Sequence, residues 1–545
     1  MSSFYPVSNE YATSVAYFSM EFAIHQPLKI YSGGLGFLSG SHMRSAFSMW
    51  QNVVGVGMLW KYGYYDQARN EDLTMRVDYT TKHYTFLEET GITVPVTVFG
   101  KEIWVKALLL KPNVFGTAPI YFLTTDIPEN DYLSKTISHH LYDPNEETRI
   151  AQSIVLGIGG GKVLDALNHH VDIYHINEAH ALPVAFHVYD QYKNWEDVKK
   201  RFVFTTHTPE KAGNEEHNFG LLEHASFFGN VPLEEIKKLD ATENDRFIYT
   251  LAALRMAKKA NGVSALHGEV SRNMWKDYSD ICYIDHITNS QNVNYWTDPQ
   301  LKEAYHSYND DWIVSRKKEL KKQLFEVIAD QTGDMLDPDI LTIVWSRRFA
   351  GYKRPDLIMR DYERFMNLID RADQPIQVIW AGKPYPLDQE AIGIYNKILQ
   401  TTLTSKRAVI LTGYELGLSA LLKKGADVWL NTPRYTREAS GTSGMTAAMN
   451  ATLNMSNRDG WMDEFGRNLE NSFMMNHAET GIHVNEQDDQ DAQFLYHSLE
   501  NDVIPTYYNN PWRWSQMVRT SMDDIFPFFN SDRMADEYYK KLYNA

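Results

Sequence analysis

The chain has 545 residues, too many for a single hydrophobic core, so we expect roughly two to four domains. Its 53 basic and 70 acidic residues give a net charge of −17, which repels nucleic acids and anionic membranes. A single cysteine, Cys282, excludes a disulfide framework within the chain, and the N-terminal residues lack a signal-peptide pattern. No apolar run reaches the roughly 18 residues of a membrane helix. We therefore expect a cytoplasmic protein without nucleic-acid or membrane partners.

Short apolar runs that end in polar or glycine-rich turns recur along the chain, and a loop or a helical pattern follows each of them. These runs are residues 15–20, 171–177 and 201–207 in the first half, and 341–346, 376–382, 408–413 and 426–431 in the second. Continuous apolar strands suit parallel sheets that are covered on both faces, and their alternation with helices indicates doubly wound α/β domains. An amphipathic pattern over residues 312–333 predicts a long helix between the two sets of strands.

Polar and glycine-rich segments lie at the ends of several of these strands. In open α/β sheets, ligands bind beyond the carboxyl ends of the strands. We therefore expect a cleft between two domains to bring these segments together. They are Glu21, residues 31–36, 177–180 and 207–208, Arg347, Arg348 and Lys353.

Four cations follow the strand 341–346 within eight residues: Arg347, Arg348, Lys353 and Arg354. Like charges about 4 Å apart repel by roughly 4 kcal/mol at an effective dielectric constant near 20, so converging cations need an anion. Solvated charges that face different ways are the ordinary explanation for such a run. The position at a strand end favours an anion site instead.

A second anion-binding signal lies in the segment "EASGTSGMTAAMN", residues 438–450, where small residues precede an Ala- and Met-rich stretch with helical preference. Small residues let backbone amides turn inward, and a helix N-terminus adds partial positive charge. Together with the cations, this turn predicts a phosphorylated ligand. Its residues are Ser440, Gly441, Thr442, Ser443 and Gly444.

Other motifs indicate no further chemistry. The run "GIGGGKVL", residues 157–164, lacks the Walker spacing and the Ser or Thr after Lys162, so we interpret it as a glycine-rich turn between a strand and a helix. The histidine pairs lack zinc-ligand spacing, and we expect no metal. The chain contains no nucleophile elbow, and no carboxylate pair for glycoside hydrolysis can be singled out among its acids.

Ordered motifs cover nearly the whole chain: "AYFSMEF", "IYSGGLGFLSGSH", "HINEAHALP", "FTTHTP", "HITN", "RRFAGYKR" and "DVWLNTPRYTREASGTSGM". Together they resemble the glycogen (α-glucan) phosphorylases, in the short form without a regulatory N-terminal extension. The resemblance implies an α/β fold of two facing, doubly wound, Rossmann-like domains, the GT-B glycosyltransferase fold. The implied parts are an N-terminal acceptor and sugar domain over residues 1–295, a C-terminal phosphate and donor domain over 296–520, and a closing helix over 521–545 that crosses back to the first domain.

The resemblance also implies an activity and a set of site residues. The family moves glucose between the non-reducing end of an α-1,4-glucan, such as glycogen or maltodextrin, and inorganic phosphate, with retention of configuration. The implied catalytic residues are His207, Arg347, Arg348, Lys353 and Glu438. The implied substrate-binding residues are Gly33, Gly34, Leu35, Glu178, His180, Asn289, Tyr352 and Ser440, and the implied phosphate- and cofactor-binding residues are Gly441, Thr442, Ser443, Gly444 and Thr446.

Thr446 departs from the family pattern, because it stands where the resemblance places the lysine that forms a Schiff base with pyridoxal phosphate. Threonine has no amine. The nearest upstream lysines, Lys423 and Lys424, precede the strand 426–431, and we do not expect them to substitute. Pyridoxal phosphate could therefore bind only non-covalently. The loop over residues 290–292 also differs from the family pattern, which puts donor or acceptor selectivity in question.

Three functions stay open from the sequence. The first is a retaining α-glucosyltransferase of the phosphorylase family with a phosphorylated glucose donor. The second is an α-glucan synthase that uses a nucleoside-diphosphate glucose and no pyridoxal phosphate, its donor diphosphate occupying the same cradle. The third is a non-catalytic glucan-binding homologue, which the retained cations disfavour. The resemblance adds a homodimer as one arrangement to expect.

Overall fold

The computed structural model describes residues 4–545, and this part of the chain divides into two compact units. The first unit contains the residues up to Tyr64 together with Tyr79–Asn289 and Ser531–Ala545. The second contains Tyr65–Asp78 and Ser290–Asn530. The chain therefore passes between the units four times, and its last residues return to the unit in which it begins.

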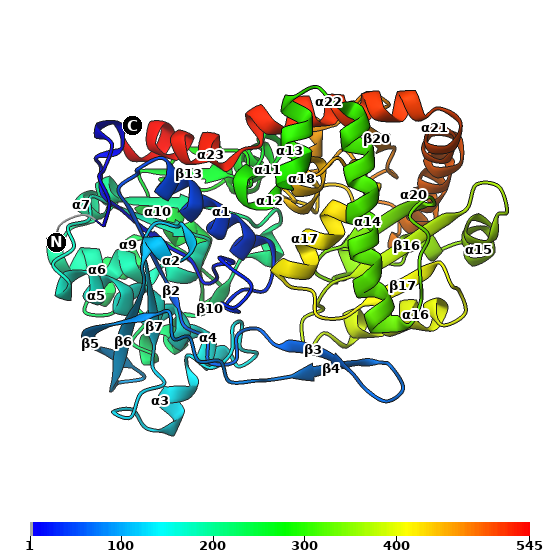
Figure 1. The fold of residues 1–545 in the computed structure, drawn as a ribbon. Helices are drawn as coiled ribbons and strands as arrows, with labels where there is room; N and C mark the ends of the chain where they lie inside the picture. The colour runs from blue at the N-terminus through cyan, green and yellow to red at the C-terminus, as the bar shows by residue number, and fades with distance from the viewer. Residues whose placement is uncertain (1–3) are drawn as a thin grey trace. The chain divides into compact units, whose positions relative to one another are not determined.

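The first unit is built on a nine-stranded sheet with the order β14-β13-β9-β8-β1-β2-β7-β6-β5. Strands β2, β5, β6, β7 and β13 of this sheet are labelled in Figure 1. Neighbours from β14 to β7 are parallel, whereas β6 and β5 are antiparallel additions. The parallel strands near the centre are buried over their whole length, as their continuous apolar runs predict. The strands are β1 (Val15–Phe18), β2 (Val53–Met58), β5 (Glu88–Val98), β6 (Lys101–Leu110), β7 (Ile120–Thr124), β8 (Ile173–Asn177), β9 (Phe202–Thr205), β13 (Lys259–Gly262) and β14 (Ile284–His286).

Helices connect these strands, as the alternating pattern predicts, and a small three-stranded sheet accompanies them. The helices are α1 (Gly34–Ser48), α2 (Pro112–Phe115), α3 (Tyr132–Thr136), α4 (Glu146–Ile154), α5 (Gly160–Ala166), α6 (Pro183–Tyr192), α7 (Trp195–Arg201), α8 (Phe219–His224), α9 (Leu233–Lys238), α10 (Tyr249–Met256), α11 (Ala265–Trp275) and α23 (Ser531–Tyr538). The small sheet consists of β10 (Glu216–Asn218), β11 (Thr242–Glu243) and β12 (Arg246–Ile248).

The second unit is built on a six-stranded, fully parallel sheet with the order β17-β16-β15-β18-β19-β20. Its central strands are also buried throughout, and they place three tryptophans, Trp345, Trp380 and Trp429, in the core. The strands are β15 (Leu341–Ser346), β16 (Ile376–Ala381), β17 (Ala408–Leu411), β18 (Val428–Asn431), β19 (Leu453–Asn457) and β20 (Ser472–Met475).

The helices of the second unit include the long helix predicted over residues 312–333, which the structure places at α14 (Asp310–Thr332), capped by Asn309 and ended by Gly333. The closing aromatic segment begins inside a helix, because the expected start at residue 521 falls within α22 (Pro511–Phe528). The other helices are α12 (Val293–Trp296), α13 (Pro299–His306), α15 (Tyr362–Asp370), α16 (Gln389–Thr402), α17 (Leu416–Gly425), α18 (Ser443–Ala448), α19 (Met462–Phe465), α20 (Val484–Ser498) and α21 (Ile504–Asn509).

Each sheet has one topological switch point, at which the strand order reverses. In the first sheet the chain proceeds from β1 through β2 to β7 on one side, and from β8 through β9 to β14 on the other. In the second sheet it proceeds from β15 to β17 on one side and from β18 to β20 on the other. The switch points therefore lie between β1 and β8 and between β15 and β18, where doubly wound sheets bind their ligands.

A hairpin from the first half of the chain belongs to the second unit. Strands β3 (Asp66–Arg69) and β4 (Met75–Asp78) form it. Gln67 donates its side-chain amide to the carbonyl of Gly382 at 3.0 Å, and the hydroxyl of Tyr65 donates to Pro384 O at 2.8 Å. The Nζ of Lys383 in turn donates to Tyr65 O at 2.7 Å. These contacts follow β16 and fix the hairpin to that loop.

The interpretation of residues 157–164 as a turn between a strand and a helix is wrong. Helix α4 continues through a π-helical turn over Val155–Gly159 into α5 without a break. Glycine is needed there for packing, because a Cβ on Gly157 would lie 2.6 Å from the backbone nitrogen of Val184. A Cβ on Gly161 would lie 2.3 Å from the ring of His187. These glycines let α6 approach closely, and they lie in a continuous helix and not in a turn.

Candidate active site

The cations predicted to form an anion site gather around one carboxylate at the switch point of the second sheet. Arg347 directly follows β15, and Glu438 lies in the loop after β18. An oxygen of Glu438 is 3.0 Å from Nη1 of Arg347, and both carboxylate oxygens accept hydrogen bonds from Nζ of Lys353, at 2.8 and 3.2 Å. All three side chains are buried or nearly so. The structure therefore brings two of the predicted cations and the predicted glutamate into contact.

The charge state of Glu438 follows from this contact. Burial alone would raise the pKa of its carboxyl, but the adjacent Arg347 and Lys353 lower the pKa to about 2. The carboxylate is therefore ionised at neutral pH and pairs with both cations.

A second carboxylate, Asp459, fixes the backbone at Glu438. Its Oδ2 accepts a hydrogen bond from the backbone nitrogen of Glu438 at 3.1 Å, and its Oδ1 accepts one from Gly460 N at 2.9 Å. Burial and the charge of Glu438 raise the pKa of Asp459 to about 7. No pattern in the sequence singles out Asp459 among the acids of the chain. The signal available was its place two residues after β19, at the carboxyl edge of the sheet.

The small-residue turn begins α18, as its sequence predicts. Gly441 has φ +80°, which glycine adopts without strain. The oxygen Oγ of Ser440 is buried and has no hydrogen-bond partner among residues 4–545. Thr446 is buried in the helix and donates its hydroxyl to Ser443 O at 3.0 Å. Within the described residues the turn thus offers a buried hydroxyl without a partner, whereas the hydroxyl of Thr446 is used within its own helix.

Of the remaining members of the basic run, Arg348 also lowers the pKa of Glu438 through its charge, whereas Arg354 pairs with other carboxylates. Arg348 is exposed, and Tyr352 lies beside Lys353, whose Nζ is 4.8 Å from the centre of the tyrosine ring. Arg354 is buried and donates to the carbonyls of Thr432 and Pro433. Its Nη1 also pairs with two carboxylates of α20, Asp488 at 3.0 Å and Asp491 at 2.6 Å. Arg354 is therefore a structural residue that ties α20 to the loop after β18.

Replacing Arg354 with methionine is expected to lower the free energy of unfolding of the second unit by about 3–5 kcal/mol, because the buried carboxylate of Asp491 loses its cation, whereas Asp488 keeps its ion pair with Arg434. A scanning-calorimetry comparison with Arg360→Met checks this. Arg360 pairs with Asp489 at 2.7 Å on a more exposed surface and is expected to contribute at most about 1 kcal/mol. Equal shifts in the two variants would contradict the structural role of Arg354.

The glycine loop of the first unit is fastened by Glu21, which follows β1. The carboxylate of Glu21 accepts hydrogen bonds from the backbone nitrogens of Ser32 and Gly33, at 2.6 and 3.1 Å, and from the hydroxyl of Tyr142 at 2.7 Å. A Cβ on Gly33 or Gly34 would meet no atom within 4 Å. The loop is thus held at its base and open above Gly33 and Gly34, where a ligand can approach the backbone. Leu35, the third predicted residue, lies in the first turn of α1.

The loop after β8 lies on the other side of this switch point. Glu178 has φ +70°, a conformation that costs a non-glycine residue of order 1–3 kcal/mol and that clusters at functional sites. Its Oε2 accepts hydrogen bonds from the backbone nitrogen of His207 at 2.8 Å and from the hydroxyl of Thr208 at 3.2 Å. Burial raises the pKa of Glu178. The strained glutamate therefore connects the ends of β8 and β9.

His207 is held by Asn177, the last residue of β8. The Asn177 oxygen Oδ1 lies 2.7 Å from Nε2 of His207, so this ring nitrogen is the donor. Burial lowers the pKa of His207 to about 3, which leaves the ring neutral at physiological pH. His180 lies in the short helical turn after Glu178, and Asn289, after β14, has a buried Oδ1 without a hydrogen-bond partner in the described part of the chain. The structure thus brings Glu178 and His207 into contact and leaves Asn289 with an acceptor to spare.

The buried amine of Lys423 lies close to α18, although its place before β18 in the sequence predicts no role for it. Lys423, on α17, has its Nζ 3.9 Å from the ring centre of Trp296. Asn450 Nδ2 donates both to Trp296 O at 2.9 Å and to Thr446 O at 2.8 Å. Burial lowers the pKa of Lys423 well below its ordinary value. Sequence order hid this contact, because α17 precedes β18 but packs against α18.

Neither a metal site nor a membrane span emerges from the described part of the chain. Within residues 4–545, no group of three or more histidine, cysteine, aspartate or glutamate side chains is arranged to hold a metal ion. None of the described helices combines the length and the apolarity that crossing a membrane requires.

Two large sheets, one mostly and one fully parallel, with polar side chains at their switch points define an α/β protein of the doubly wound class. A family model described as "Carbohydrate phosphorylase" matches residues 249–501. An uncharacterized protein of Methanocaldococcus jannaschii is 49% identical to the chain over 97% of its length and 99% of that protein. The maltodextrin phosphorylase of Thermococcus litoralis is 31% identical over 97% of the chain and 70% of that enzyme. The glycogen phosphorylase of Aquifex aeolicus is 31% identical over 98% and 86%.

The chain belongs to the carbohydrate phosphorylase family. This confirms the family resemblance of the sequence motifs and places the protein among the glycosyltransferases of carbohydrate metabolism.

Proposed function

We propose that the protein is a retaining α-glucosyltransferase that moves glucose between an α-1,4-glucan and a phosphate-bearing partner. The observation that carries this proposal is the contact of Glu438 with Arg347 and Lys353 at the switch point of the second sheet. Cations that are already collected around one anion can exchange it for another without reorganising, which is the condition for stabilising charge in a transition state. The names of two relatives, maltodextrin phosphorylase and glycogen phosphorylase, support the substrate class.

In this proposal the phosphate binds to Arg347 and Lys353, with Arg348 adding charge from the exposed side. Glu438 is then released from part of its pairing and accepts a hydrogen bond from a sugar hydroxyl. Asp459 fixes the backbone of Glu438 during this exchange. Ser440, whose buried hydroxyl has no partner within the described chain, supplies a further group to the sugar or phosphate.

The proposal assigns the sugar to the first unit. Gly33 and Gly34 present open backbone, and the neutral His207 and the free acceptor of Asn289 suit uncharged hydroxyl groups. The reaction requires these groups and the cations of the second unit to reach the same glucosyl residue. The facing GT-B domains that the family resemblance implies, with the N-terminal domain over residues 1–295 and the C-terminal domain over 296–520, are therefore part of the proposal.

The residues fit one part of pyridoxal phosphate and not another. Arg347 and Lys353 suit its phosphate, which would supply an acid–base group beside the substrate. The residue at the position that the family resemblance assigns to its Schiff-base lysine is Thr446, whose hydroxyl cannot form an imine and donates to Ser443 O. We therefore propose that any such cofactor binds without a covalent bond to residue 446. Thr446 is also the observation that favours the second candidate, a synthase that takes its second phosphate from a nucleoside-diphosphate glucose.

A donor panel tests the proposed function. Purified protein is incubated with maltoheptaose and, in turn, glucose 1-phosphate, uridine-diphosphate glucose and adenosine-diphosphate glucose, and chain elongation is scored. Elongation from glucose 1-phosphate supports the phosphorylase reaction, and elongation only from a nucleotide sugar supports the synthase. Glucan binding without elongation from any donor, with and without added pyridoxal phosphate, would contradict both and leave the non-catalytic homologue.

A further inference from the structure

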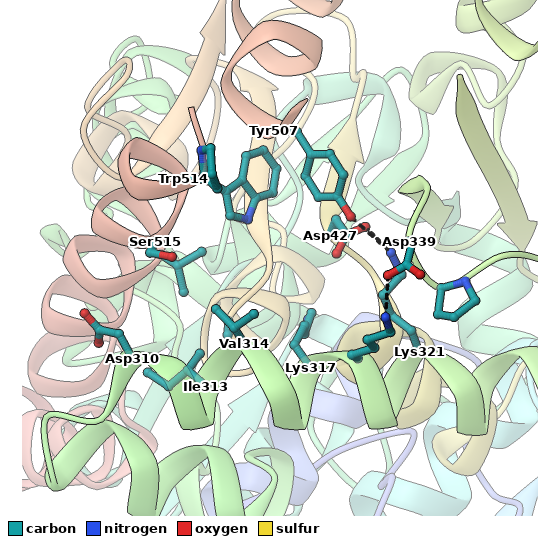
Figure 2. Close-up of a pocket in the computed structure, with 15 residues that line it drawn as sticks. Asp310, Ile313, Val314, Lys317, Lys321, Asp339, Asp427, Tyr507, Trp514 and Ser515 are labelled. Atoms are coloured by element: carbon teal, nitrogen blue, oxygen red, sulfur yellow. Dashed lines mark hydrogen bonds and ion pairs between the residues drawn. The ribbon is translucent and has the colours of Figure 1, made fainter. Parts of the chain in front are cut away.

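A cavity of about 230 Å3 lies in the second unit, between the facing sides of α14 and α22. Ile313 and Val314 of α14 form one wall, and Trp514 and Val518 of α22 form the other. Figure 2 shows the indole of Trp514 and the ring of Tyr507 across the cavity from α14. The cavity is smaller than the roughly 300–1,000 Å3 of pockets for drug-sized ligands, so its ligand has to be small.

This cavity is separate from the candidate active site. Its floor is made by residues that precede strands: Asp339 before β15, Asp427 before β18 and Ala451 before β19. Those positions lie at the amino ends of the parallel strands. Arg347 and Glu438 follow the carboxyl ends of β15 and β18, at the opposite edge of the sheet. A ligand in the cavity would therefore not meet the cations around Glu438.

Three lysines line the cavity, and among the described residues one of them has no carboxylate partner. Lys321 pairs with Asp427 at 2.6 Å, and Lys318 pairs with Asp339 at 2.5 Å. The third lysine, Lys317, donates to Asn450 O at 2.8 Å and to the hydroxyl of Thr452 at 2.5 Å, and both acceptors are neutral. Within the described chain no carboxylate forms an ion pair with Lys317.

Because Lys317 is buried, leaving its ammonium group without an anionic partner costs free energy. The side chain is almost fully buried, and burial lowers its pKa to about 7, although the more distant Asp427 and Asp298 act in the other direction. A buried ammonium is stabilised by an anion at hydrogen-bond distance, and Lys317 has a third N–H to donate when it is protonated. The cavity it lines is where such an anion has room.

Lys317 also connects the cavity to α18. Its acceptor Asn450 donates its side-chain amide to Thr446 O, in the helix that begins at the small-residue turn. The same amide donates to Trp296 O, and the oxygen Oδ1 of Asn450 accepts from Asp298 N. Lys317 thus donates directly to Asn450, the residue that fixes the end of α18. A change in the charge or position of Lys317 therefore acts on that residue through one hydrogen bond.

We propose that this cavity binds a small organic carboxylate, with its charge on Lys317 and its apolar part between Val314 and Trp514, and that the ligand stiffens α18 through Asn450. The hydrophobic walls select an apolar body, and the unpaired cation selects the negative charge. The binding site stands independently of the proposed glucosyl transfer, because no active-site residue contributes to it.

Binding is tested with benzoate and with benzyl alcohol, which has a similar shape and no charge, by titration calorimetry on the full-length protein. Benzoate is expected to bind at least tenfold more tightly than benzyl alcohol. Val314→Trp, on a half-exposed position at the cavity wall, should abolish binding, whereas Leu403→Trp, on an equally exposed position outside the cavity, should not. Equal affinities for the two probes, or benzoate binding that survives Val314→Trp, would overturn the proposal.

Two further measurements locate the ligand and its effect. Inorganic phosphate in excess should not displace benzoate; displacement would put benzoate at the cations around Glu438 and refute the cavity site. Amide hydrogen exchange over residues 443–452 should slow in the presence of benzoate in the wild type and stay unchanged in Val314→Trp. Unchanged exchange in the wild type at saturating benzoate would refute the connection to α18. Neither readout depends on the donor panel, so failure of the proposed enzymatic function would leave this inference standing.

Discussion

Replacing Glu438 with glutamine is expected to lower glucosyl transfer by at least 10²-fold and, at the same time, to tighten the binding of inorganic sulfate. In the proposed function Glu438 is a preorganised, ionised group at the reacting centre, and removal of one preorganised group from such a centre costs roughly 10²–10³ in rate. The gain follows because Arg347 and Lys353 lose the one carboxylate that pairs with both of them. We expect the Kd for sulfate to fall at least tenfold, which is about 1.4 kcal/mol.

Stability gives a third readout for the same variant. The pKa of Glu438 is lowered to about 2, so its carboxylate stabilises the folded state above its unfolded pKa, and this contribution is lost as the pH falls towards 2. At pH 7 the Glu438→Gln protein should therefore melt at a lower temperature than the wild type in anion-free buffer, and sulfate should restore its melting temperature.

Glu479→Gln is the matched control for this experiment. It removes one negative charge from an exposed position of the same unit and should change neither the transfer rate nor the sulfate affinity. If Glu438→Gln binds sulfate no more tightly than the wild type, Arg347 and Lys353 do not form the anion site. If transfer is lost while the sulfate affinity stays unchanged, Glu438 acts on the sugar and does not affect anion binding by Arg347 and Lys353.

The parts of the fold that the sequence predicts are those with a strong local pattern. Strands β8, β15 and β18 are mostly apolar and buried throughout because both faces are covered, and α14 has a long amphipathic pattern ended by Gly333. The hairpin of β3 and β4 was not predicted, since its strands are short and largely polar and its partners are residues 382–384, far along the chain. Glycine misled the prediction at residues 157–161, because the sequence does not show whether a glycine serves a turn or a close helix contact.

The candidate site also contains some residues that a local sequence pattern predicts and others that it does not. A run of cations after a strand can be found from the sequence, and Arg347 and Lys353 do converge. Their neighbour Arg354 turns to Asp491 on α20, which no local pattern reveals. Asp459 was missed because its role comes from a hydrogen bond to a backbone nitrogen 21 residues earlier. Lys423 was set aside because it precedes β18 in sequence, whereas in space it contacts Trp296.

Replacing Thr446 with lysine is expected to convert non-covalent into covalent binding of pyridoxal phosphate. The substitution puts an amine at the position that the family resemblance assigns to the Schiff-base lysine, on a helix that follows the predicted phosphate turn. The variant, incubated with pyridoxal phosphate and freed of excess cofactor, should keep an imine absorbance band. Borohydride should fix the band, and peptide mass mapping should place the adduct at residue 446.

Two controls separate the amine at residue 446 from other causes. Thr446→Met introduces an unbranched side chain without an amine, so it should stay colourless while it carries a comparable packing disturbance. Lys423→Met in the Thr446→Lys background removes the other buried amine beside Trp296, and the band should persist. If the wild-type protein is instead labelled at Lys423, covalent attachment does not depend on residue 446, and the absence of a lysine there has no chemical consequence.

The Thr446→Lys result also discriminates between the two enzymatic candidates. A coloured variant would mean that the cations around Glu438 still accept the cofactor phosphate and that there is room for its ring, which supports a phosphorylase reaction with a loosely held cofactor. A folded but colourless variant in excess pyridoxal phosphate would mean that the ring is excluded. The phosphate that Arg347 and Lys353 bind would then have to arrive on the donor itself, and the nucleotide-sugar synthase would become the better description of the protein.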